Sequence, residues 1–108
     1  MEKIPICIVG CGGMGHRHLL AYKVLQDTGI ANLDLVALCD VRPESAALCA
    51  GEMQRVLGRT PMVFHDLDEV LAHPDIAAVD VVTDGSTHHE IAVPALKAGK
   101  HALVEKPL

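Results

Sequence analysis

Aromatic side chains are almost absent from this sequence. Its 108 residues contain no Trp, and Tyr22 and Phe64 are the only aromatic residues, 2% of the chain. Hydrophobic residues make up 50% and charged residues 21%, which excludes a disordered polar tail and is enough to bury the core of one small domain. We therefore expect a core built from Val, Ile, Leu, Met and Ala.

Long hydrophobic runs and clustered positive charge are also missing. No run approaches the roughly 18 apolar residues of a membrane span, and the first residues lack the basic region and cleavage site of a secretory signal. The net charge is −5, and residues 61–108 hold three basic and eight acidic side chains, which we interpret as a solvated surface. Neither a membrane nor a nucleic acid is an expected partner.

The four cysteines, Cys7, Cys11, Cys39 and Cys49, have spacings that fit no zinc site. Cys7 and Cys39 lie in apolar runs, where a thiol packs as a small hydrophobe. We expect all four to be reduced, as in a cytoplasmic protein, and predict no metal site. The sequence also lacks the phosphate-binding pattern G-x-x-x-x-G-K-[ST] and the nucleophile pattern G-x-S-x-G, which argues against P-loop and serine-hydrolase chemistry.

What the chain does contain is an alternation of short β-rich runs with amphipathic segments. Strands are predicted at 4–9, 33–39, 62–64, 77–83 and 101–104. Helices are predicted at 14–28, 43–57, 67–72 and 88–98. This order predicts an α/β fold with a doubly wound parallel sheet of five strands and helices on both faces.

Single residues mark several of the predicted helix ends. Asp66 is a candidate N-cap, and Thr87 with Glu90 has the spacing of a capping box. Pro94 falls inside the last helix, where it removes one hydrogen bond and is expected to kink the axis. The apolar spacing of the first helix predicts one shared face, formed by Met14, His18, Ala21 and Leu25.

A glycine-rich segment joins the first strand to the first helix. Gly10, Gly12 and Gly15 form the pattern G-x-G-x-x-G in the strand–turn–helix context that dinucleotide binding requires. The first glycine permits a tight turn, the second lets the backbone approach a pyrophosphate, and the third lets helix and strand pack closely. The helix N-terminus then presents unpaired N–H groups to the phosphates.

An acidic residue follows the second strand, as this type of site requires. Asp40 lies 25 residues after Gly15, where a carboxylate accepts hydrogen bonds from the adenosine ribose hydroxyls and repels a 2′-phosphate. Arg42 lies two residues further on and has the charge to bind that phosphate. The sequence therefore favours NAD, with NADP left open. The alternative role for Asp40 is to begin the turn before Pro43.

The C-terminal half carries a second, more specific set of motifs. The segment Thr83–His88 follows the fourth strand, and the chain ends with ALKAGKHALVEKPL. Together with the glycines, these motifs resemble the N-terminal domain of the Gfo/Idh/MocA oxidoreductases over essentially the whole chain. The sequence departs from the family in having Asp84 and Gly85 where Pro and Asn are usual.

The resemblance implies a Rossmann domain that binds NAD or NADP and an enzyme that is a dehydrogenase. It assigns Thr83 to the nicotinamide side, His88 to the start of the next helix, and Glu105 and Lys106 to the Glu-Lys-Pro motif. Lys106 would be the catalytic residue, contacting substrate or assisting proton transfer. The candidate cofactor-binding residues are Gly10, Gly12, Gly13, Met14, Gly15, Asp40, Arg42, Thr83, His88 and Glu105.

The resemblance also implies that residues 1–108 are the cofactor-binding part of a longer enzyme. A second α/β domain would bind the substrate, expected to be a sugar or cyclitol hydroxyl. Two alternatives remain, a non-catalytic NAD-binding module and an inactive fragment that self-associates. Since the 101–104 strand would be an exposed sheet edge, a homo-oligomer is expected.

Overall fold

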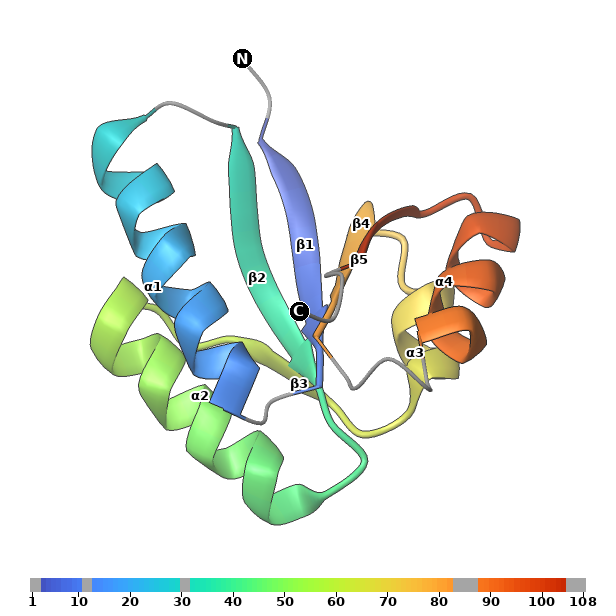
Figure 1. The fold of residues 1–108 in the computed structure, drawn as a ribbon, viewed down its shortest axis with the longest axis horizontal. Coiled ribbons are helices and arrows are strands. Elements are labelled where there is room, and N and C mark those ends of the chain that lie inside the picture. The colour runs from blue at the N-terminus through green and yellow to red at the C-terminus, as the bar shows by residue number, and fades with distance from the viewer. Residues whose placement is uncertain (1–2, 11–12, 30–31, 83–87, 105–108) are drawn as a thin grey trace.

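Five parallel strands form one sheet in the computed structural model, which describes residues 3–10, 13–29, 32–82 and 88–104. The strands are β1 (Ile4–Val9), β2 (Leu33–Cys39), β3 (Met62–Phe64), β4 (Ala78–Val81) and β5 (His101–Val104). Their order across the sheet is β3-β2-β1-β4-β5 (Figure 1). The chain thus builds outward from β1 in one direction and then in the other.

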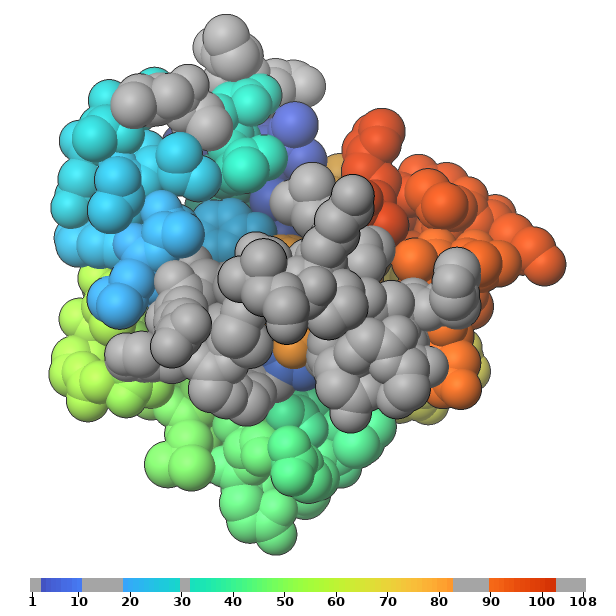
Figure 2. Space-filling model, viewed as in Figure 1, coloured from blue at the N-terminus to red at the C-terminus, as the bar shows by residue number. Residues whose placement is uncertain are grey.

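Four helices connect the strands: α1 (Gly13–Thr28), α2 (Pro43–Leu57), α3 (Leu67–Ala72) and α4 (His88–Lys97). In Figure 1, α1 and α2 lie on one side of the sheet, and α3 and α4 lie on the other. The space-filling view separates the same groups, with α1 (blue) at the left, α2 (green) below it and α4 (orange) at the right (Figure 2). The predicted doubly wound α/β fold is confirmed.

Two aliphatic clusters, one on each side of the sheet, make up the core. Along β1, Ile6 and Ile8 join the cluster beneath α1 and α2, whereas Cys7 and Val9 join the cluster beneath α3 and α4. The strand buries both faces, which explains why its sequence is a continuous apolar run rather than an alternating one. The expected core of aliphatic side chains is confirmed, with Tyr22 as the one buried aromatic ring among the described residues.

A buried hydrogen bond links α1 to β4. The Tyr22 hydroxyl donates to Asp80 Oδ2 over 2.9 Å, and both residues are almost fully buried. A carboxylate is costly to bury without hydrogen bonds. This bond therefore favours the rotation of α1 that brings Tyr22 over the sheet, and Leu19 is buried from the same helix.

The rotation of α1 contradicts the face predicted from its apolar spacing at Ala21, while the side chains of Met14 and His18 lie outside the described residues. Ala21 is exposed and Leu25 is only half-buried, while Leu19 and Tyr22 lie in the core. The prediction was wrong because spacing alone gave Tyr22 no preference over Ala21. The bond to Asp80, a residue 58 positions away, supplies that preference.

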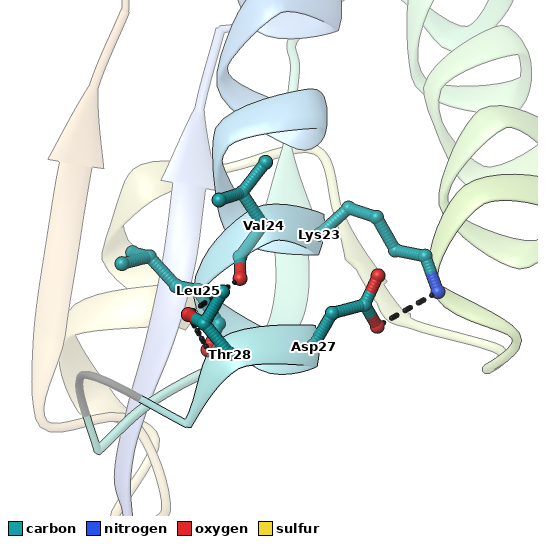
Figure 3. Close-up of polar contacts among 5 residues, drawn as sticks. All are labelled: Lys23, Val24, Leu25, Asp27 and Thr28. Carbon is teal, nitrogen blue, oxygen red and sulfur yellow. Dashed lines mark hydrogen bonds and ion pairs between the residues drawn. The ribbon is translucent and has the colours of Figure 1, made fainter.

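The helix ends follow local signals closely. Asp66 caps α3 by accepting a hydrogen bond from the Asp68 amide, as predicted. Gly58 ends α2 in a left-handed conformation, with φ of 74°, and donates its N–H to Gln54 O. In the last turn of α1, the Thr28 hydroxyl donates to Val24 O over 2.8 Å, and Lys23 pairs with Asp27 over 3.1 Å (Figure 3).

Element bounds differ from the predictions at three places. Helix α1 begins at Gly13, one residue early, and α4 ends at Lys97, one residue early. Strand β4 covers 78–81 rather than 77–83, although Ala77 and Val82 still donate their N–H groups to β1, at Pro5 O and Val9 O. Helix α4 continues through Pro94, and Thr87 lies outside the described residues.

The structure describes three of the four cysteines. Cys7 and Cys39 are buried and form no disulfide, Cys49 is buried as well, and Cys11 lies outside the described residues. No helix in the described part of the chain has both the length and the apolar character needed to cross a membrane.

Candidate functional site

The carboxyl ends of the five strands lie in one row. The register pairs Val9 with Cys39 and with Val81, Cys39 with Phe64, and Val81 with Val104. In open parallel sheets, ligands bind outside this edge, at the point where the strand order reverses. Here that point lies between β1 and β4, because the chain runs from β1 outward to β3 and then returns to β4.

Gly10 leaves β1 at this edge in a conformation that favours glycine. Its φ is 93°, a region that side chains with a Cβ rarely adopt. Its N–H donates to Cys39 O over 2.8 Å, so the start of the turn is held against the end of β2. Helix α1 begins three residues later, at Gly13, which brings a helix N-terminus to the same edge.

Asp40 is the residue immediately after Cys39, and its carboxylate is buried at the end of β2. Its side chain is 6% exposed, and Oδ1 accepts a hydrogen bond from the Arg42 amide over 2.9 Å. The Arg42 Nε lies 3.9 Å from the same oxygen, with the guanidinium side chain 67% exposed. Asp40 therefore begins the turn before α2, which was the alternative role predicted for it. It also follows the residue that bonds Gly10, as the prediction of a ribose-binding carboxylate requires.

His65, which sequence analysis did not single out, lies next to Asp40. It follows β3, and its ring Nδ1 is 3.1 Å from Asp40 O. The Asp40 N–H in turn donates to Phe64 O over 3.0 Å. A three-residue strand gives too weak a sequence signal to fix the register of His65. Once the pairing of β3 with β2 is known, the position of His65 directly after β3 places it next to Asp40.

Negative charge gathers at the ends of β2 and β3. Burial first, and then the carboxylates of Asp40, Asp66 and Glu69, raise the pKa of the Cys39 thiol to about 11. The thiol of Cys39 therefore lies in an electrostatic environment that disfavours negative charge. A buried carboxylate in such surroundings suits hydroxyl donors better than it suits another anion.

Several predicted site residues lie outside the described residues: Gly12, Thr83, Glu105 and Lys106. Gly13, Met14 and Gly15 form the first turn of α1, and His88 is the first residue of α4. In the part of the chain that the structure describes, no cluster of His, Cys, Asp or Glu could hold a metal ion. The predicted site residues that are described and do come together are Gly10, Asp40 and Arg42.

A cavity of about 360 Å³ lies at the amino ends of β1 and β2, away from the carboxyl ends of the strands. It is lined by residues from the ends of α1 and α2 and the beginnings of β1 and β2, including Tyr22, Leu35 and Leu57. Asp34, at the start of β2, pairs there with Arg59. None of the predicted site residues that the structure describes lines this cavity.

A glycine with positive φ after β1, a helix N-terminus and a buried carboxylate at the switch point of a doubly wound sheet define a dinucleotide-binding module. The family comparison agrees. Residues 4–108 match the model of the Gfo/Idh/MocA oxidoreductase family, NAD-binding Rossmann fold, and the chain belongs to this family.

Curated relatives match over the full chain. The chain is 34% identical over 111 residues to an inositol 2-dehydrogenase/D-chiro-inositol 3-dehydrogenase of Lactiplantibacillus plantarum, and 33% identical to a levoglucosan dehydrogenase of Pseudarthrobacter phenanthrenivorans. Both matches include 100% of the chain, but only 28% and 27% of the relatives. The chain thus spans little more than a quarter of the length of these relatives.

Solved structures also match nearly the whole of this chain but only part of their own length. A levoglucosan dehydrogenase in complex with NADH and L-sorbose matches with a TM-score of 0.83 and 30% identity, over 99% of this chain and 28% of that one. An oxidoreductase domain protein from Kribbella flavida matches with a TM-score of 0.80 and 34% identity, over 100% and 28% respectively.

Proposed function

We propose that residues 1–108 are the cofactor-binding domain of an NAD-dependent dehydrogenase. The observation that supports the proposal is the hydrogen bond from the Gly10 N–H to Cys39 O, because Cys39 directly precedes Asp40. A cofactor whose pyrophosphate lies against the glycine turn would have its adenosine ribose near Asp40. The buried carboxylate, already facing N–H donors, fits the ribose hydroxyls.

The reaction we propose is hydride transfer between the nicotinamide ring and a carbon that bears a hydroxyl. Bound NAD would supply the hydride acceptor at C4 of its nicotinamide. Lys106 would hydrogen-bond the substrate oxygen and assist its loss or gain of a proton, and Thr83, His88 and Glu105 would line the nicotinamide side. Gly12, Gly13, Met14 and Gly15 would contact the phosphates.

The substrate we propose is a sugar or cyclitol, because the relatives include dehydrogenases named for inositol and levoglucosan. A substrate domain beyond residue 108 would hold it, since the chain spans only 28% of the first of these relatives. We further propose a cytoplasmic homo-oligomer. The buried thiols of Cys7 and Cys39, which form no disulfide, support a reducing compartment.

The test is a calorimetric titration of the 108-residue chain with NADH, using two matched variants. Asp40→Asn removes the charge beside the glycine turn, and Asp34→Asn makes the same change at the other end of β2. Loss of a charge-assisted hydrogen bond predicts that Asp40→Asn weakens binding about tenfold or more. Asp34→Asn should bind like the parent.

Two results would refute this proposal. One is the absence of saturable binding at millimolar NADH, which would leave the self-associating fragment as the better account. The other is an equal loss in both variants, which would mean that the effect comes from the stability of β2. Binding without any turnover in the full-length protein would instead favour the non-catalytic NAD-binding module.

A further inference from the structure

His65 is held beside Asp40 by backbone geometry. Cys39 pairs with Phe64 across β2 and β3, so the two residues that follow these strands are neighbours. The Asp40 N–H donates to Phe64 O, and the His65 Nδ1 lies 3.1 Å from Asp40 O. Two backbone groups of Asp40 are therefore bonded to the 64–65 segment, and the imidazole has a defined position.

The contact to a backbone carbonyl determines which ring nitrogen carries the proton. A carbonyl oxygen only accepts hydrogen bonds, so Nδ1 must be the donor. In the neutral ring, Nε2 is then a lone-pair acceptor, and in the charged ring it is a second donor. His65 is exposed, so its ring is accessible to solvent.

The charged groups nearest to His65 along the chain, or linked to it through its contact with Asp40, come from two segments. Asp40 and Arg42 lie on the β2–α2 turn, and Asp66, Asp68 and Glu69 lie at the start of α3. Asp66 is engaged as the α3 cap, and Arg42 contacts Asp40 at 3.9 Å. Arg42 is the one fixed positive charge in this set, against four carboxylates.

We propose that His65 controls whether this site accepts a phosphate on the adenosine 2′ oxygen. With His65 neutral, Arg42 alone opposes the carboxylates and the site selects NAD. With His65 protonated, the imidazolium and Arg42 supply two positive charges beside Asp40, and NADP binds as well. The ratio of NADP to NAD affinity therefore rises as the pH falls. This inference rests on the proposed function, because it needs the adenosine ribose at Asp40.

The experiment measures the Kd of NAD⁺ and NADP⁺ for the 108-residue chain by calorimetry at pH 8.0 and pH 6.0. Oxidised cofactors are used because they survive acid. His65→Gln keeps a polar side chain without the charge. His101→Gln is the control. His101 is an exposed histidine at the start of β5, and β5 and β3 are the two outermost strands of the described sheet.

The parent and His101→Gln should bind NADP⁺ about threefold to fivefold more tightly at pH 6.0, the gain of one exposed ion pair. His65→Gln should show no gain, because the 2′-phosphate itself loses charge near pH 6. NAD⁺ affinity should change less than twofold in every variant.

The outcomes separate the two proposals. NAD⁺ binding combined with an equal NADP⁺ response in His65→Gln and the parent overturns the role of His65 alone. NAD⁺ binding without NADP⁺ binding at either pH does the same. Absence of NAD⁺ binding at both pH values refutes the proposed function, and this inference with it.

Discussion

At the scale of single residues, burial controls the chemistry of the cysteines. Cys39 has a pKa raised to about 11, first by burial and then by the neighbouring carboxylates. Burial raises the pKa of Cys7 further, and the nearby Cys39 and Cys49 act in the same direction. The thiolate is the reactive form, so these side chains are expected to be inert in the folded chain.

A thiol titration checks this expectation. In a Cys11→Ser background, which leaves the three described cysteines, an aromatic disulfide reagent at pH 8 should label fewer than one thiol per chain within the time that labels all three in denaturant. At pH 8 a thiol with pKa 11 is about one thousandth ionised. Rapid labelling of the native chain would show that one of these thiols is accessible.

The same buried groups are expected to lower the stability of the fold at alkaline pH. Tyr22 also has a raised pKa, through burial and then the charge and hydrogen bond of Asp80. An acid whose pKa is raised by folding stabilises the fold below its unfolded pKa and loses that contribution as the pH rises toward its folded pKa. The free energy of unfolding should therefore fall from about pH 9 upward. Urea titrations at pH 8, 9 and 10 measure the slope, and a flat profile would contradict the burial of these groups.

At the scale of elements, glycines end the helices through backbone conformation rather than through space. Gly58 at the end of α2 has φ of +74°, whereas Gly51 lies within the same helix, and a Cβ added at either meets nothing within 4 Å. Gly58→Ala should destabilise the chain by about 1 kcal/mol. Gly51→Ala should stabilise it by about 0.5–1 kcal/mol. Opposite shifts in the urea midpoint are expected, and equal shifts would mean that conformation is not the cause.

Such local signals explain which parts of the fold could be predicted. Gly58, Pro43 and Asp66 each determine a helix end through their own backbone or side chain, so the bounds of α2 and α3 were predicted correctly. The buried face of α1 was not, because it depends on the bond between Tyr22 and Asp80. Contacts between distant residues leave no pattern in the sequence near either one.

The residues of the candidate site likewise divide into those that local sequence signals predict and those that depend on distant contacts. Gly10 and Asp40 each follow a long apolar strand, so both could be placed at the carboxyl edge from the sequence. His65 could not, because its strand has three residues and its partner, Asp40 O, follows a neighbouring strand 25 residues earlier in the chain. The sequence also does not reveal the strand order, since β1 pairs with β2 and with β4, where Val9 lies opposite Val81.

At the scale of the whole molecule, the described sheet ends at β5, and this edge can be tested for self-association. The His101 N–H donates to Ala77 O, which directs it toward β4. Because backbone groups alternate along a strand, the N–H of Ala102 faces outward from the sheet. Unpaired groups on an exposed edge pair readily with another chain.

A proline at this position distinguishes edge pairing from other contacts. Ala102→Pro removes an outward N–H without removing a bond to β4, while Ala102→Val keeps the N–H and favours the strand. Light scattering should show a mass that rises with concentration for the parent and for Ala102→Val, and a monomer for Ala102→Pro. Thermal unfolding of the three chains confirms that each is folded. If the parent stays monomeric at high concentration, or Ala102→Pro associates like the parent, the chain does not assemble through β5.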